Sequence, residues 1–278
     1  MGVFICVSSL SKNEANKLQS IADSLVRYVH IEHQCMRVYS LNQGHCYLID
    51  FAVDNALYKI EDQIHIISSN NEIVSLTIIN GYCWFETGSG GEVLSAVDLH
   101  NLIESKDRNV EQIRNQLSGE YSVVHIYDNG NILAFNDNLG IEHIYYSEAP
   151  NQYIITNRVS LIDVIQPKYS YDYLGMLWMQ TIGYLIGEHT YRQDVRSLSQ
   201  GGSLKITQGG LHLLENPHWL FPEGTIDNRG WKHISDFQIE TAIESAMANV
   251  NILSRKNQDI LELGITGGKD SRVVLALC

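Results

Sequence analysis

The sequence has few basic side chains for its length. Its 278 residues include 19 Lys and Arg against 32 Asp and Glu, a formal net charge of −13. Nucleic-acid-binding surfaces depend on clustered Lys and Arg, so the charge argues against nucleic acid as a partner. A single nucleotide such as ATP is not excluded, because converging backbone N–H groups bind phosphate whatever the overall charge.

Cysteine is also scarce, and long apolar runs are missing. The five cysteines are an odd number and form no C-x-x-C pair, which is typical of a reducing compartment rather than of a disulfide or zinc framework. No signal-peptide pattern opens the chain, and the most apolar later segment, residues 174–187, is too short to span a bilayer. We therefore expect a soluble, cytoplasmic protein with no membrane partner.

Proline is rare enough for its positions to be informative. Two of the four prolines, Pro217 and Pro222, fall close together and are followed by Gly224, a pattern typical of a connector. The length suits about two domains of roughly 150 residues. We place the boundary at this connector, with one domain over residues 1–225 and the beginning of a second over 226–278.

The first domain has the pattern of a strand-rich α+β fold. Residues 3–7 form an apolar run typical of a buried strand, and Ser11 with Glu14 forms a capping box that opens a helix. Segments rich in β-branched and aromatic residues follow between residues 35 and 85. Residues 121–156 read as a meander whose Asn-Gly turn predicts a hairpin. We expect two stacked, mainly antiparallel sheets with helices outside.

The second domain is expected to begin as a parallel α/β unit. Apolar residues at helical spacing between Ile239 and Leu253 predict an amphipathic helix. An apolar strand over residues 260–265 is followed by the loop 266–271 (TGGKDS) and then by a helix-like segment. The order of strand, glycine loop and helix is typical of the start of such a unit.

The TGGKDS loop carries the chemistry that the sequence suggests. Gly267 and Gly268 allow backbone N–H groups to converge on an anion at a helix N-terminus, and the Ser271 hydroxyl can donate to it. A carboxylate would repel phosphate, so Asp270 is best explained as a Mg²⁺ ligand. The loop is neither a Walker A motif nor G-x-G-x-x-G. The alternative, a plain turn in which the glycines only relieve sterics, stays open.

The loop resembles the pyrophosphate-binding loop (PP-loop) of the N-type ATP pyrophosphatases, S-G-G-x-D-S, with Thr266 in place of the first Ser. The resemblance implies ATP and Mg²⁺ as cofactors, with Asp270 as the metal ligand. It implies three catalytic residues, Lys269, Asp270 and Ser271. For Lys269 the alternative, a solvated residue at the helix start, stays equally open. The expected ATP-binding residues are Ile265, Thr266, Gly267, Gly268, Asp270 and Ser271.

The whole chain resembles the asparagine synthetase family. Residues 117–122 (LSGEYS) match L-x-G-x-[FY]-[AS]. Residues 136–146 (NDNLGIEHIYY) resemble R-D-x-x-G-x-x-P-L-Y-Y with two departures, Asn136 in place of Arg and His143 with Ile144 in place of Pro-Leu. Residues 80–81 (NG) resemble the segment that contributes to the family's glutaminase oxyanion hole. The resemblance implies an N-terminal-nucleophile-type αββα sandwich. This would be followed by the beginning of an α/β PP-loop (adenine nucleotide α-hydrolase-like) domain.

The residues that a glutaminase of this family needs are missing. Such an enzyme uses a Cys at position 2, exposed after Met removal, with its own α-amino group as base. Here position 2 is Gly2, and the nearest thiol, Cys6, lies in an apolar strand where a thiol is inert. We therefore expect an inactive glutaminase-like domain, as in the family's lasso-peptide cyclases and β-lactam synthetases.

The hypothesis that results is an ATP-dependent, AMP-forming carbon–nitrogen ligase. It would adenylate a carboxylate and transfer the acyl group to an amine, and macrolactam or β-lactam closure fits best because no ammonia is made. The expected partners are a small-molecule or peptide carboxylate, and for a cyclase a precursor peptide with its maturation protease or leader-binding protein. Alternatives are an ammonia-using asparagine synthetase and a noncatalytic scaffold or half of a split synthetase. We expect the synthetase domain to be incomplete at Cys278.

Two other clusters have simpler explanations. His30, His33 and Cys35 lie in an alternating, strand-like segment and are not favoured as metal ligands. The aromatic residues between positions 169 and 178 are interpreted as core between domains rather than as a substrate site.

Overall fold

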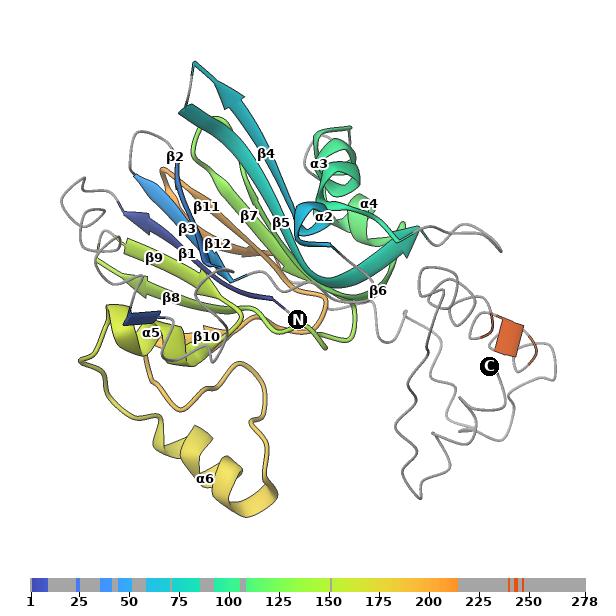
Figure 1. Cartoon of the computed structure of the whole chain (residues 1–278). Coiled ribbons are helices and arrows are strands. Elements are labelled where there is room, and N and C mark those ends of the chain that lie inside the picture. Colours follow the sequence, from blue (N-terminus) through green and yellow to red (C-terminus); the bar gives the residue numbers. More distant parts are fainter. Residues whose placement is uncertain are drawn as a thin grey trace.

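A computed structural model gives the architecture of the first part of the chain (Figure 1). The residues that it describes are 2–9, 24–25, 36–41, 45–51, 59–70, 72–85, 93–105, 109–150, 152–214, 240, 243–244 and 247. All of the statements below refer to these residues.

The first half of the sheet is antiparallel throughout, in the order β10-β8-β9-β1-β3-β2. Both faces of β1 are buried, because Phe4 and Cys6 point to one side while Val3, Ile5 and Val7 point to the other. The buried strand expected at residues 3–7 is therefore confirmed. The strands of this half are β1 (Val3–Ser9), β2 (Met36–Leu41), β3 (Cys46–Phe51), β8 (Tyr145–Ala149), β9 (Gln152–Thr156) and β10 (Val195–Ser197).

The second half runs in the order β5-β6-β7-β11-β12, with β4 paired to β5. The hairpin of β6 and β7 turns at Gly130, whose φ of 78° is in the left-handed region, so the Asn-Gly turn signal is confirmed. A single parallel pair, Leu41 with Ile73, joins the two halves. The strands of this half are β4 (Ile64–Ser69), β5 (Glu72–Phe85), β6 (Leu117–Ile126), β7 (Ile132–Asn136), β11 (Ser203–Thr207) and β12 (Gly210–Leu214).

The packing makes four layers, as the sequence predicts. A central core draws on both halves of the sheet, with Phe4 and Leu48 from one half and Val124 and Leu204 from the other. Two outer cores lie beneath helices, with α5 (Val159–Ile165) over the first half and α3 (Ala96–Ser105) with α4 (Val110–Arg114) over the second. Figure 1 shows α3 and α4 on one side of the strands and α5 on the other. The fold is an α+β, αββα sandwich, and its two sheets are continuous through one strand pair instead of separate.

Two further helices complete the described part, α2 (Ile60–Gln63) and α6 (Tyr173–Ile182). No described helix is both long and apolar enough to cross a membrane. Of the helix expected to open at Ser11, only Ser24 and Leu25 are described, and both are helical.

Most of the second domain lies outside the described residues. After β12 the structure describes only Glu240, Ile243, Glu244 and Met247, all of them helical, as expected for an amphipathic helix there. The boundary at residue 225 and the α/β unit that begins after it stay predictions.

Candidate functional site

The predicted ATP and Mg²⁺ site lies outside the residues that the structure describes. Its metal ligand, Asp270, and the rest of the loop therefore have no structural description. The residues concerned are Ile265, Thr266, Gly267, Gly268, Lys269, Asp270 and Ser271. What the structure does describe is the site in the first domain that the resemblance to a glutaminase implies.

The structure brings position 2 and the NG segment together, although 78 positions separate Gly2 from Asn80 in the sequence. Gly2 leads into β1, and a Cβ atom built on it would lie 3.7 Å from Asn80 Oδ1 and 3.4 Å from both Gln63 Oε1 and the Phe51 carbonyl oxygen. A side chain at position 2 would therefore begin beside Gln63, the Phe51 carbonyl oxygen and Asn80. Glycine supplies no functional group there.

A row of buried polar side chains continues from Asn80 across three strands. Asn80 on β5 pairs with Ser122 on β6, which pairs with Asn136 on β7, so the three side chains share one face of the sheet. Each is at most 4% exposed. The face is the inner one, since Ile78 and Val124, two residues along their strands, belong to the central core.

Four atoms of this row, called the polar row below, have no hydrogen-bond partner within the described protein. They are Asn80 Oδ1, Ser122 Oγ and both the Oδ1 and the Nδ2 of Asn136. A buried polar group left unpaired costs roughly 1–3 kcal/mol, so native proteins rarely keep several together unless water or a ligand binds them. The polar row is therefore suited to a small molecule that both donates and accepts hydrogen bonds, or to ordered water.

Glu142 adds an ionisable group to the polar row. Its side chain is 6% exposed, and its Oε2 accepts a hydrogen bond from Asn80 Nδ2 at 2.5 Å. Burial, reinforced by the negative charges of Asp137 and Glu120, raises the pKa of Glu142 to about 7. Glu142 can thus gain or lose a proton near neutral pH. The sequence analysis missed this residue, because nothing in its local pattern marks it.

Asp137 holds the segment that carries Glu142. Its carboxylate accepts backbone N–H groups of Leu139, Ile141 and Glu142 at 2.9, 3.2 and 2.9 Å. The Asp of the NDNLGIEHIYY segment therefore stabilises a loop, and its charge acts on Glu142 through space.

The NG and LSGEYS segments each contain a glycine, Gly81 and Gly119, that no other residue could replace without strain. Gly81 has φ 87° and Gly119 has φ 127°, both in the region that favours glycine. A Cβ on Gly81 would overlap the carbonyl oxygen of Glu120, and one on Gly119 would overlap that of Tyr82. The two glycines allow β5 and β6 to approach closely at this point, and this approach sets the position of Asn80.

Cys6 does not replace the missing nucleophile. It is fully buried in the central core, and its Sγ lies 3.8 Å from the Sγ of Cys46. The hydrogen bond with Cys46 and burial raise the pKa of Cys6 well above the ordinary range for a thiol. A thiol in this state is inert, as the sequence analysis expects.

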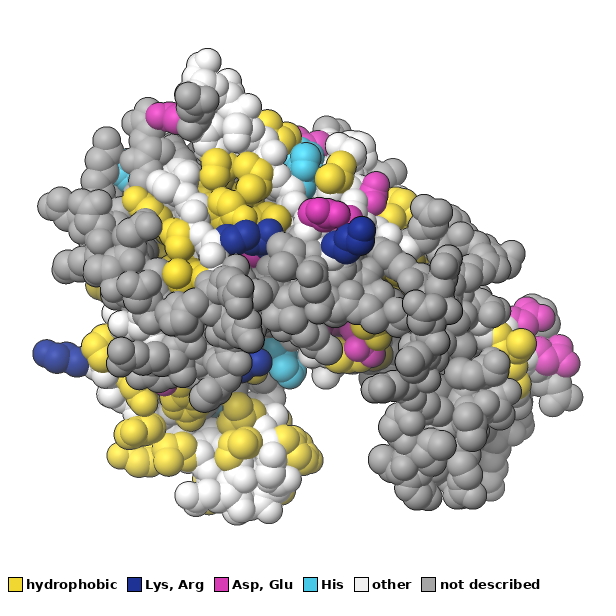
Figure 2. Space-filling model, viewed as in Figure 1, with side chains coloured by type: hydrophobic (Ala, Val, Ile, Leu, Met, Phe, Trp, Pro, Cys, Tyr) yellow, Lys and Arg dark blue, Asp and Glu magenta, His cyan; other side chains and the backbone are white. Residues whose placement is uncertain are grey.

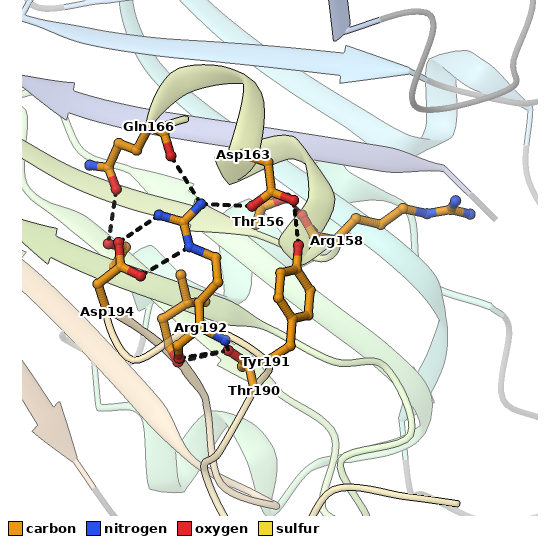
Figure 3. A network of polar contacts seen from close by, with 10 residues as sticks. Thr156, Arg158, Asp163, Gln166, Thr190, Tyr191, Arg192 and Asp194 are labelled. Atoms are coloured by element: carbon orange, nitrogen blue, oxygen red, sulfur yellow. Dashed lines mark hydrogen bonds and ion pairs between the residues drawn. The ribbon is translucent and has the colours of Figure 1, made fainter. Parts of the chain in front are cut away.

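A second polar cluster, drawn in Figure 3, is structural. The fully buried guanidinium of Arg192 donates to Asp163 at 2.7 Å and to Asp194 at 2.5 Å. It also lies 4.2 Å from the centre of the Tyr169 ring, and Tyr191 donates to Asp163. Arg192 thus pairs with both carboxylates, which ties α5 to the segment before β10. The aromatic residue Tyr169 thus belongs to packing within the first domain.

No group of three or more His, Cys, Asp or Glu side chains among the described residues is placed to hold a metal ion. His30, His33 and Cys35, which the sequence disfavours as ligands, lie outside those residues.

Comparison with known proteins identifies no family by sequence. No family model matches the chain, and no curated protein matches it. Among solved structures, it is similar to glutamine phosphoribosylpyrophosphate amidotransferase from B. subtilis, with 12% identity and a TM-score of 0.43 over 77% of this chain. A structure described as the allosteric regulatory enzyme of purine biosynthesis has 11% identity and a TM-score of 0.44, also over 77% of this chain. The match covers 49% of each of these longer chains. Such low similarity adds nothing to the assignment of function, which depends on the residues themselves.

Proposed function

We propose that this chain forms the front part of an ATP-dependent, AMP-forming amide-bond ligase of the asparagine synthetase type, with a glutaminase-like domain that no longer hydrolyses glutamine. The observation that carries the proposal is the position of Gly2 beside Asn80. Position 2, where a glutaminase of this family has its nucleophilic Cys, lies next to the segment that resembles the family's oxyanion hole. In this chain position 2 is a glycine. The TGGKDS loop supplies the other half of the argument, from sequence.

The loss of glutaminase chemistry follows from what each nearby group can do. Glutamine hydrolysis by a covalent route needs a nucleophile at the reacting carbon and a base to activate it. Gly2 has no side chain, and Cys6 is held in the core with a raised pKa. Cys83 is also fully buried, and burial raises the pKa of its thiol far above neutrality. None of these described thiols can replace a cysteine at position 2.

The proposed ligase reaction places the chemistry in the second domain. A substrate carboxylate attacks the α-phosphorus of ATP, forming an acyl-adenylate and releasing pyrophosphate. An amine then attacks the acyl carbon and releases AMP. Backbone N–H groups of residues 266–271 and the side chains of Lys269 and Ser271 would hold the phosphates. Asp270 would hold Mg²⁺, which offsets the charge of the leaving pyrophosphate.

The source of the amine narrows the class of product. A front domain that makes no ammonia leaves the substrate, or a second substrate, to supply the nucleophile. We therefore favour closure of a macrolactam in a peptide or of a β-lactam over asparagine synthesis. For peptide closure, a precursor peptide and the protease or leader-binding protein that processes it would be partners.

The test of the ligase proposal is the binding of Mg·ATP to the complete protein by isothermal titration calorimetry. Asp270→Asn should weaken binding at least tenfold, about 1.4 kcal/mol, and remove its dependence on Mg²⁺, whereas Lys269→Ala should weaken it less. If Asp270 only caps a helix, Asn fills that role at a cost of about tenths of a kcal/mol and binding is unchanged. Wild-type affinity in Asp270→Asn with an unchanged melting temperature would contradict the proposal.

The inactive front domain has its own test. The complete protein incubated with glutamine should release no glutamate above the rate in buffer, because Gly2 supplies no nucleophile. Glutamate release that disappears in Cys6→Ala would show that a cysteine acts after all.

A further inference from the structure

Three histidine side chains meet beneath α3, beside the apolar core that this helix covers. His65 on β4 pairs with Thr77 on β5, and Thr77 pairs with His125 on β6, so the three form one row across the strands. His100 on α3 lies over this row, with its ring centre 4.9 Å from that of His65 and 5.2 Å from that of His125. We call His65, Thr77, His100 and His125 the histidine cluster.

The histidine cluster is buried at one end and open at the other. Thr77 and His125 are fully buried and His100 is 6% exposed, whereas His65 is half-buried. Figure 2 shows a histidine side chain at the surface where β4 and α3 lie in Figure 1. Protons can therefore exchange with solvent at His65, while a charge on His100 would be largely removed from water.

The Thr77 hydroxyl links the two buried rings. Its Oγ1 lies 3.1 Å from Nδ1 of His100 and 2.8 Å from Nδ1 of His125. A hydroxyl has one proton to donate, so at least one ring must donate its own Nδ1–H to Oγ1. Nε2 of His125 lies 3.3 Å from Oε1 of Glu104, which favours a proton on that nitrogen and leaves Nδ1 of His125 as the acceptor.

These contacts set the order of protons in the neutral histidine cluster. His125 has its proton on Nε2, toward Glu104, and accepts the Thr77 hydroxyl at Nδ1. His100 then donates Nδ1–H to Thr77, and its Nε2 has no proton. A further proton on Nε2 of His100 breaks none of these contacts, so burial and nearby charge decide whether it binds.

Two effects keep His100 neutral. Burial lowers its pKa below the ordinary value of 6.5, and the neighbouring His65 lowers it further, against the smaller opposing effect of Glu104. The elements packed against α3 are α2, β4, β5 and α4. The other titratable groups on these elements, on α3 itself and on β6 are Glu61, Asp62, Glu72, Tyr82, Cys83, Asp98, Glu111, Arg114, Glu120, Tyr121 and His125.

We propose that the histidine cluster is a pH-sensitive latch, which holds α3 on the sheet while its rings are neutral and loosens α3 as His100 takes up a proton beside His65. When α3 opens, His100 enters water and regains its ordinary pKa, so below pH 6.5 the open state binds more protons than the closed one. The closed state is therefore favoured above this pH and loses ground as the pH falls. Opening would uncover part of the apolar core, and it does not depend on the proposed ligase reaction.

General acid unfolding is the competing explanation. Asp50 and Glu142, whose pKa values burial raises to about 6 and about 7, act in the opposite direction. Each binds its proton more tightly in the folded state, so each stabilises the fold as the pH falls through this range. A loosening confined to α3 would thus point to the histidine cluster.

The test is hydrogen exchange of the complete protein at pH 7.5 and pH 5, corrected for the intrinsic effect of pH on exchange. In His100→Asn, the side-chain Nδ2 takes the place of Nδ1 and can still donate to Thr77, but it takes up no proton in this range. The matched control is His212→Asn, the same change at an exposed histidine on β12. In His65→Asn the neighbouring charge is removed, so the pKa of His100 should rise, as NMR of the histidine rings measures.

The α3 amides of the wild type and of His212→Asn should exchange faster at pH 5, by about tenfold for each unit by which the measured pKa of His100 lies below 6.5. The amides of β6 and β7 should change little, and His100→Asn should abolish the effect in α3. Unchanged α3 exchange, or an equal increase in β6 and β7, would overturn the proposal. If His100→Asn does not fold, His65→Asn decides, because a His100 pKa that it leaves unchanged also overturns the latch.

Discussion

Replacing Glu142 by Gln would test the electrostatics of the polar row, because it removes the ionisable group while keeping its shape. The carbonyl oxygen of a Gln side chain can accept the hydrogen bond that Asn80 Nδ2 donates to Glu142 at 2.5 Å. The two proteins should therefore differ in how the folded state responds to pH and little in packing.

The magnitude follows from the raised pKa. Burial, with the charges of Asp137 and Glu120, takes the pKa of Glu142 from 4.5 to about 7. Between these values the folded state binds the proton more tightly than the unfolded state, so stability falls as pH rises through this window. At 1.36 kcal/mol per pKa unit, the wild-type protein would carry a cost of about 3 kcal/mol above pH 7. Glu142→Gln has no such cost, so it should match the wild type near pH 4 and exceed its stability by up to this amount at pH 8.

Urea unfolding at several pH values between 4 and 8 measures the difference directly. Asp50, whose pKa burial raises to about 6, titrates in an overlapping range, but it is present in both proteins and cancels in the comparison. Glu148→Gln, an exposed change on β8, is the matched control, because it replaces the same functional group outside the polar row. A stability difference between Glu142→Gln and wild type that stays constant from pH 4 to 8 would refute the reasoning.

Three other substitutions test how the fold is held. Gly81→Ala and Gly183→Ala both place Ala at positive φ, 87° and 82°, but only at Gly81 would the Cβ meet a backbone carbonyl. Gly183→Ala should cost about 1–2 kcal/mol in urea unfolding and Gly81→Ala clearly more; equal costs would show that β5 and β6 do not approach as closely as described. Arg192→Met should cost about 3 kcal/mol, the low end for breaking a buried ion pair, because Asp163 and Asp194 keep 25% and 37% exposure and can be hydrated. A loss below about 1 kcal/mol in thermal or urea unfolding would mean that the Arg192 cluster is dispensable.

Local patterns in the sequence predict much of the first domain. A short apolar run identifies β1, and the Asn-Gly dipeptide identifies the turn of the β6–β7 hairpin. Each of these signals acts over a few neighbouring residues, because period and turn chemistry are properties of a short stretch of backbone. The layered α+β class follows from the same signals, since apolar faces on both sides of the strands need cover on both sides.

Only the tertiary structure decides what the site contains. The contact of Gly2 with Asn80 depends on β1 and β5 belonging to two halves of a sheet joined by one pair, Leu41 with Ile73. Glu142 reaches the polar row because Asp137 holds its loop, and its raised pKa results from burial, which no local pattern reveals. By contrast, the sequence alone shows that position 2 has no nucleophile, since glycine has no side chain in any fold. The sequence thus determines which groups exist, and packing between distant segments determines which of them meet and how they titrate.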